Sequence, residues 1–242
     1  MPTVDAFTLI SGGSYPYHNM LRVIPPTLGK IRDVGIDRYN GYLSALLSTP
    51  EDLLEALGVD ASILDECPKD PLIFMTLFPP LRNELIAAVS FFIDKTLTYD
   101  DEIGYCVDGE VLTLDGFRDV RSIILQLCCV EDSVTPPKKF RNEKARKIYE
   151  LIQARKAEQA KAAKKSKKEN PDTAFPNLIS AFCANSQSYN LLNVWDLTIY
   201  QFYDQYHRLD TKIQLDVFGL RWAAWGKKDF DFSLWHKAPP KK

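Results

Sequence analysis

The chain has 242 residues, of which 45% are apolar and 12% aromatic, enough to bury a hydrophobic core in one large domain or two small ones. Its formal net charge of −2 excludes the broad positive field that is typical of proteins whose whole surface binds nucleic acid or anionic membranes. The longest apolar runs, such as 85–93, are far shorter than the ~20 residues that span a bilayer, so no membrane segment is expected.

The N-terminal part of the chain is predicted to form an arm followed by a helical domain. Residues 1–20, which include the run Gly12-Gly13-Ser14, are typical of an extended, irregular arm. Residues 21–140 are expected to form a helical domain, opening with a short strand at 21–24. Within this domain, the sequence marks helix starts and breaks by local chemistry: Thr27 as an N-cap, Gly35 as a divider, Thr49 before Pro50, and a break at Pro79-Pro80.

A short stretch of this domain has a different pattern, near residues 103–114. Apolar residues alternate on both sides of Asp108-Gly109, a pair typical of tight hairpin turns. We therefore expect one small β-hairpin, preceded by a solvated turn at the acidic run 100–102. Asp115 is expected to cap the next helix, whose buried side carries Phe117, Val120, Ile123, Ile124 and Leu127.

A strongly basic segment follows, at residues 141–172. Its part from 141 to 168 holds eleven Lys or Arg against three Glu, a net charge of +8, and its alanine content favours a long charged helix that ends in a linker. Two interpretations stay open: a solvated helix that keeps the chain soluble, or a nonspecific contact to phosphates. The candidate basic surface comprises Lys144, Arg146, Lys147, Arg155, Lys156, Lys161, Lys164 and Lys165.

The residues from 173 to 236 are predicted to form a C-terminal helical subdomain rich in aromatic side chains, with a tail at 237–242. Thr198 and Gln201 have the spacing of a capping box, so a helix is expected from there to Leu209, followed by a last helix from Thr211 to Trp225. Not all aromatic residues of such short helices can face one small core, and some are expected to bind a partner. The candidate partner-binding residues are Trp195, Tyr200, Phe202, Tyr203, Tyr206, Trp222 and Trp225.

Catalytic and metal-binding patterns are not found in the sequence. The histidines at 18, 207 and 236 have neither zinc-motif spacing nor a nearby nucleophile, and the five cysteines include no C-x-x-C pair. We therefore expect no enzyme activity, no cofactor, no metal and no disulfide framework. The first residues carry no basic and apolar signal segment, which favours a cytoplasmic protein.

Three segments resemble proteins of tailed phages and prophages of Gram-positive bacteria. They are the run 118–125 after the hairpin, the run 140–148 that leads into the charged helix, and the run 193–205 with its Trp-Asp-Leu-Thr helix start. The last segment is similar to the helical C-terminal region of tail assembly chaperones. The resemblance implies a tail morphogenesis factor, mainly α-helical, that acts in the cytoplasm of the host cell.

The resemblance also implies a set of partners. Such a chaperone binds the long tape measure protein, keeps its helices soluble, and helps to recruit tail tube subunits; self-association is a further expectation. The first alternative is a structural virion protein of the neck, tail or baseplate. The second is a nucleic-acid-binding accessory protein that uses the basic helix, although the low arginine and aromatic content of that segment argues against it.

Overall fold

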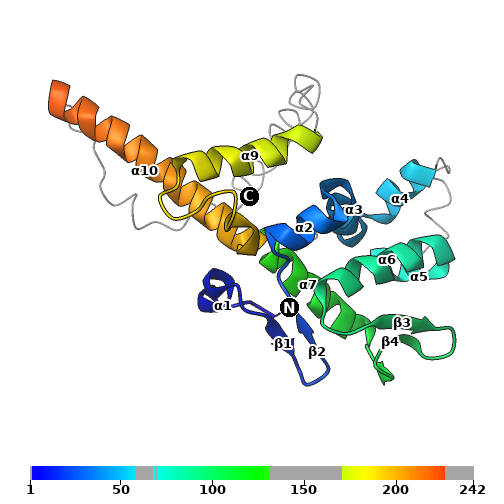
Figure 1. Cartoon of the computed structure of the whole chain (residues 1–242). Helices are drawn as coiled ribbons and strands as arrows, with labels where there is room; N and C mark the ends of the chain where they lie inside the picture. Colours follow the sequence, from blue (N-terminus) through cyan, green and yellow to red (C-terminus); the bar gives the residue numbers. More distant parts are fainter. Residues whose placement is uncertain (1, 58–67, 69, 131–170, 227–242) are drawn as a thin grey trace, which may run out of the picture. The chain divides into compact units, whose positions relative to one another are not determined.

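The computed structural model describes residues 2–57, 68, 70–130 and 171–226 (Figure 1). The protein is mainly α-helical, as predicted, with two small antiparallel sheets among the described residues. The described residues fall into two compact units. One comprises 2–57, 68, 70–130 and 182–226, and the other contributes 171–181.

The first twenty residues are not the irregular arm that the sequence predicts. They contain helix α1 (Ala6–Ser11) and strand β1 (Tyr15–Tyr17), which pairs with β2 (Leu21–Val23) in a hairpin. Asp5 caps α1 by accepting a hydrogen bond from the Thr8 amide, and Gly12 ends it in the left-handed region with φ 69°. The glycine therefore terminates a short helix instead of making an arm flexible.

Local signals place the next three helices where the sequence predicts them. These are α2 (Leu28–Val34), α3 (Ile36–Leu47) and α4 (Pro50–Leu57). The Thr27 hydroxyl accepts from the Lys30 amide 3.1 Å away, and Gly35 separates α2 from α3 with φ 86°. Thr49 likewise accepts from the Asp52 amide at 3.3 Å, ahead of Pro50 at the first helical position.

The predicted break at the proline pair divides the next helical stretch in two. Its parts are α5 (Pro71–Leu77) and α6 (Pro79–Phe92), with Phe78 extended between them. Asp70 caps α5 by accepting from the amides of Leu72 and Ile73. Proline at the start of α6 removes an amide that has no helical partner there, so the break costs little.

The predicted hairpin exists, and it belongs to a sheet of three strands. Strands β3 (Leu97–Asp100), β4 (Gly104–Val107) and β5 (Glu110–Val111) pair in that order. Asp108 and Gly109 make the turn between β4 and β5 with φ values of 50° and 84°, as a two-residue hairpin loop of this kind requires. The expected acidic turn joins β3 to β4. The sequence pattern missed β3 itself.

Helix α7 (Leu114–Leu127) carries the centre of the core. Thr113 caps it, not Asp115 as predicted, by accepting from the Gly116 amide at 3.1 Å. The five residues predicted to face inward are all buried: Phe117, Val120, Ile123, Ile124 and Leu127. Each contributes roughly 1.5–3 kcal/mol by leaving water, so this helix organises the unit around it.

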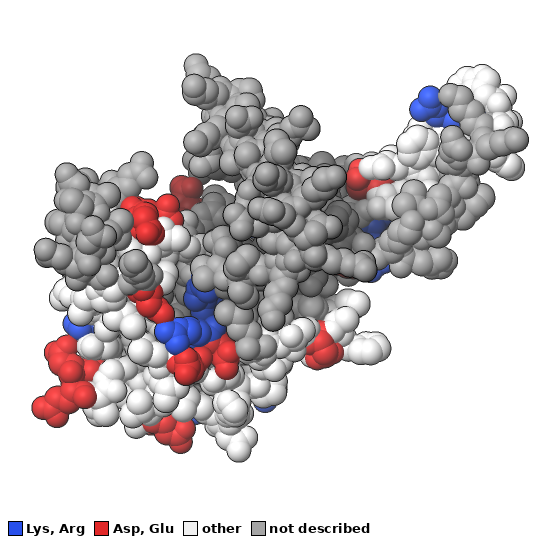
Figure 2. Space-filling model, turned by 180° about the vertical axis from the view of Figure 1, so that it is seen from behind, with Lys and Arg blue, Asp and Glu red and all other residues white. Residues whose placement is uncertain are grey.

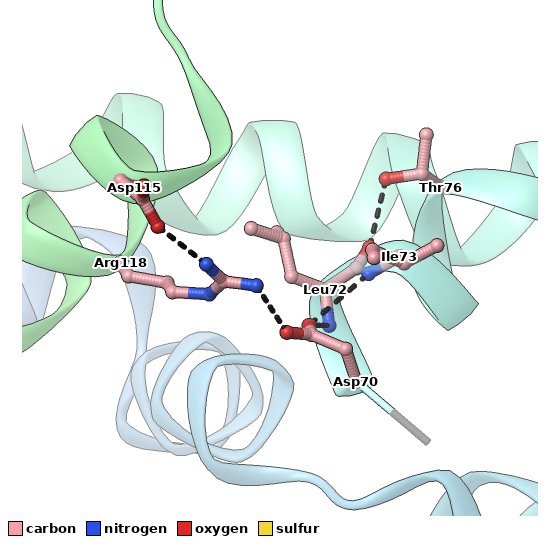
Figure 3. Close-up of polar contacts among 6 residues, drawn as sticks. All are labelled: Asp70, Leu72, Ile73, Thr76, Asp115 and Arg118. Atoms are coloured by element: carbon pink, nitrogen blue, oxygen red, sulfur yellow. Dashed lines mark hydrogen bonds and ion pairs between the residues drawn. The ribbon is translucent and has the colours of Figure 1, made fainter. Parts of the chain in front are cut away.

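One arginine ties α7 to the start of α5 (Figure 3). Arg118 lies between two carboxylates: it donates to Asp115 on its own helix and to Asp70, the cap of α5. Partial burial acts to raise the pKa of Asp70, but the Arg118 guanidinium and the α5 amides together hold that pKa below its usual value. Arg118, which belongs to one of the phage-like segments, therefore has a structural contact here.

The C-terminal elements are α9 (Pro171–Asn185), the 3₁₀ turn η2 (Val194–Asp196) and α10 (Ile199–Trp225). Helix α9 begins at Pro171, inside the predicted linker, and spans the boundary between the two units. Its predicted apolar face is confirmed: Ile179 and Phe182 are buried, and Leu178 and Cys183 are half-buried. The two predicted last helices are one continuous helix, which Gly226 ends with φ 60° as expected.

The described part of the predicted C-terminal subdomain, from Phe182 onward, does not stand apart from the N-terminal residues. The Leu28 amide donates to the Leu197 carbonyl at 2.8 Å, and the Ile199 amide donates to the Pro26 carbonyl at 2.9 Å. These two bonds form an antiparallel bridge between Thr27 and Thr198. The division of the chain therefore differs from the predicted one, because a long-range backbone contact joins segments that are distant in sequence.

None of the helices within the described ranges combines the length and apolar character needed to cross a membrane.

Candidate protein-binding site

The predicted capping box is present at the start of α10. The Thr198 hydroxyl accepts from the Gln201 amide at 3.2 Å, and the Gln201 side chain accepts from the Thr198 amide at 3.0 Å. The Gln201 side-chain amide also donates to the Ile10 carbonyl at 3.0 Å, which joins α10 to α1. The first turn of the helix that carries the candidate residues is thus held by both local and long-range bonds.

Phe202 lies in the core, so its predicted role in contacting a partner is wrong. Its side chain is 0% exposed, and its ring meets Phe182 edge-on and Tyr206 in a stacked arrangement. Because four residues make slightly more than one helical turn, Phe202 and Tyr206 share one face of α10. That face builds a hydrophobic core in the first two turns.

Three further candidates in the same turns are half-buried: Tyr200, Tyr203 and Tyr206. Burial raises the pKa of Tyr200 and of Tyr203 above the usual value for a phenol, and the neighbouring Cys129 acts in the same direction. Close by, burial also raises the pKa of the Cys128 thiol to about 12. A thiol with that pKa is a poor nucleophile at neutral pH, which gives this cluster a packing role.

A charged pair completes the first half of α10. Arg208 donates to both carboxylate oxygens of Asp204, at 2.8 and 3.1 Å, one turn away on the same helix. The Asp204 side chain is buried, and its hydrogen bonds to Arg208 raise the pKa of that guanidinium. A two-pronged pair of this geometry satisfies a buried carboxylate that would otherwise be costly.

Trp195 anchors the turn before α10. Its indole N–H donates to the Leu191 carbonyl at 2.7 Å, and the guanidinium of Arg32 lies 5.1 Å from the centre of its ring. A Cβ atom at Gly29 would come within 3.2 Å of the Trp195 carbonyl, so the two segments approach closely. The half-buried Trp195 is therefore part of the joint between α2 and α10.

The second half of α10 is different in kind, because its apolar side chains are exposed. Trp225 is 69% exposed, Trp222 48% and Phe218 47%. Three- and four-residue spacing places these three rings along one stripe of the helix, here called the aromatic stripe. Large exposed aromatic rings in a row are typical of sites where a protein partner binds.

A second exposed stripe follows the same half of the helix. We call it the aliphatic stripe. It lies roughly 140° around the helix from the aromatic one, at ~100° per residue. This stripe was not predicted from the sequence, although the three- and four-residue spacing of its members was the signal for it. The stripe consists of the exposed Ile213, Val217 and Leu220 and, just before them, the half-buried Leu209.

The candidate basic surface, Lys144 to Lys165, lies outside the described residues. On the face drawn in Figure 2, acidic side chains predominate over basic ones on the described part of the molecule. Since segment 141–168 carries +8 and the whole chain −2, the rest of the chain has a net charge of −10. The face drawn in Figure 2 thus offers nucleic acid no broad basic field.

Within the described ranges, no group of three or more His, Cys, Asp or Glu side chains is arranged to hold a metal ion. Separately, the second half of α10 exposes large apolar side chains to solvent.

No curated protein and no solved structure matches the chain. Residues 164–238, which include the whole of α10, match the model of a family described as YomV second domain. YomV is a protein of the SPbeta prophage region of Bacillus, so over these residues the chain is similar to a phage-associated domain.

Proposed function

We propose that the protein is a tail morphogenesis factor of a tailed phage, which binds tape measure helices on the aromatic stripe of α10 and keeps them soluble during assembly. The observation that carries the proposal is the exposure of Phe218, Trp222 and Trp225 on one side of a single long helix. The similarity of residues 164–238 to a phage-associated domain supports the phage origin that the proposal assumes.

The physical argument rests on what such a stripe does in water. Exposed aromatic rings lower their free energy by packing, and tryptophan and phenylalanine anchor many interfaces with large buried areas at little cost in side-chain entropy. An amphipathic client helix presents apolar residues with the same three- and four-residue spacing. A helical client laid along α10 would therefore cover the aromatic stripe over its full length.

A pull-down of co-expressed proteins tests the proposal. The tape measure protein of the same phage is produced with the tagged chain, once as wild type and once with Phe218→Ala and Trp225→Ala together. We expect the double variant to lose most of the client, because truncation of central aromatic anchors costs roughly 2 kcal/mol or more each. The amount of tape measure protein in the soluble fraction should also fall.

The matched control is Phe7→Ala in α1, which removes an equally large and even more exposed ring, 88% accessible, from the same compact unit. It is expected to keep the client. Circular dichroism of the double variant should retain helicity, because the replaced side chains are exposed and alanine favours helices. A double variant that retains the client as well as Phe7→Ala does would contradict the proposal.

The two alternatives have separate tests. A structural protein of the neck, tail or baseplate would be found by mass spectrometry in purified particles, whereas a chaperone should be absent from them. A nucleic-acid-binding role through segment 141–168 requires affinity that falls steeply as salt rises, because lysine contacts to phosphates release counterions.

A further inference from the structure

The aliphatic stripe is a second apolar surface on the same half of α10, and its flanking charges follow a specific pattern. Its members Ile213, Val217 and Leu220 are between 44% and 73% exposed. Asp210 and Arg221, about three turns apart, lie on the edge that faces the aromatic stripe. Lys212 and Asp216, one turn apart, lie on the opposite edge.

We propose that this stripe is a homodimer interface, in which two copies of α10 pack antiparallel about a two-fold axis near Leu215. In that register, Ile213 lies opposite Val217 of the second copy, and Leu209 lies opposite Leu220 of the second copy. The two-fold axis repeats each contact. Four apolar layers thus close over the exposed Ile213, Val217 and Leu220 and the half-buried Leu209.

The flanking charges select this register. In an antiparallel pair, each edge of one helix packs against the equivalent edge of the other helix. A residue five or six positions before the two-fold axis therefore faces a residue of the second copy that lies five or six positions after the axis. Asp210 then faces Arg221 of the second copy, and the symmetry gives this pair twice. On the other edge, Lys212 comes within one turn of Asp216 of the second copy. All four charged residues gain a partner of opposite sign.

A parallel arrangement of the two helices would pair fewer of these charged residues with residues of opposite sign. With both helices in register, Asp216 comes near Arg221 of the second copy, but Asp210 and Lys212 face neutral residues. Within α10, the Gln214 side-chain amide donates to one carboxylate oxygen of Asp210 at 2.8 Å, and the second oxygen can accept a further bond. Charge complementarity therefore favours the antiparallel pair.

The dimer does not compete with the proposed client. The edge that carries Asp210 and Arg221 lies between the aliphatic and the aromatic stripe. In the dimer this edge packs against the same edge of the second copy. Both aromatic stripes therefore lie on the same side of the helix pair. The dimer would expose two aromatic stripes side by side on one face. The inference itself rests on the aliphatic stripe and its charges, not on client binding.

Sedimentation of the purified full-length chain over a range of concentrations is the first test. A dimer is expected, and a chain that stays monomeric at every concentration would overturn the proposal. Ile213→Glu should shift the equilibrium to monomers, because a carboxylate would be buried in the central layer. The matched control is Phe218→Glu, on the aromatic stripe, which should keep the dimer; equal dissociation by both variants would refute the choice of face.

Charge reversal then tests the orientation. Asp210→Arg and Arg221→Asp should each raise the dimer Kd about tenfold, since each turns two attractive pairs into repulsive ones. The two reversals combined should restore the wild-type Kd. If Asp210→Arg has no effect, and Asp216→Arg combined with Arg221→Asp is the rescuing pair instead, the helices pack parallel and the proposed register is wrong.

Discussion

The two halves of α10 form one unbroken helix but have opposite relations to water. In the first half, Phe202 is wholly buried, Asp204 is paired with Arg208, and the start is fixed by a capping box. In the second half, from Asp210 to Trp225, every large apolar side chain except the half-buried Leu215 is exposed. Similar residue types thus serve the fold in one half and are available for recognition in the other.

This difference shows that aromatic content alone does not identify a binding surface. Both halves are rich in aromatic residues, and only the neighbours in space separate them. The first half meets α1 and Phe182 of α9, whereas the second half extends past these contacts. A helix of 27 residues is about 40 Å long, longer than a small domain requires. Its surplus length is where the large apolar side chains are exposed.

The largest difference in stability between the two halves of α10 is expected when a buried and an exposed aromatic residue are compared, beginning with Phe202→Ala. Removing a wholly buried phenylalanine should lower the free energy of unfolding by about 3–5 kcal/mol, through lost burial and the cavity that remains. Trp225→Ala, at the exposed end, should change it by less than about 0.5 kcal/mol. Urea denaturation measures both. Similar losses for the two variants would mean that the halves do not differ.

A smaller effect is expected at the helix start. Thr198→Ala removes the hydroxyl that caps α10 and should cost about 1 kcal/mol. Thr211→Ala, in the middle of the same helix, is the matched control. Its hydroxyl donates only to the His207 carbonyl one turn earlier, so its loss should be neutral or slightly stabilising. A cost at Thr211 as large as at Thr198 would show that the capping box is not what distinguishes the first turn.

The last comparison sets the joint that carries α10 against an open site in α3, and the two changes should have small effects of opposite sign. Gly29→Ala places a Cβ 3.2 Å from the Trp195 carbonyl, so it should destabilise by about 1 kcal/mol as the two segments separate. Gly41→Ala, in the exposed interior of α3 with open space around it, should stabilise by about 0.5–1 kcal/mol. Thermal unfolding of the two variants compares them directly, and a stabilising Gly29→Ala would argue against a tight joint.

Features that depend on adjacent residues could be predicted from the sequence. The Asp108-Gly109 turn, the Thr27 cap, the proline break before α6 and the capping box of α10 each arise from bonds that close within a few residues. The inward face of α7 followed from its periodicity for the same reason.

Features that depend on distant residues were not predictable in this way. Helix α1 has only six residues, too few to be stable alone, and it is held through contacts such as the bond from Gln201 to the Ile10 carbonyl. Asp210-Thr211 suggested a helix boundary, because both residue types favour caps, yet the helix continues through them. Whether Phe202 or Trp225 is buried depends on Phe182 and α1, which local patterns do not place.

The bridge between Thr27 and Thr198 has a consequence for how the chain can be divided. The family match covers residues 164–238, but the Ile199 amide and the Leu197 carbonyl find their partners at Pro26 and Leu28. A fragment cut at the family boundary would expose both groups and uncover the ring of Trp195 that Arg32 faces. Two backbone groups of the matched segment therefore find their partners at Pro26 and Leu28, which lie outside the match.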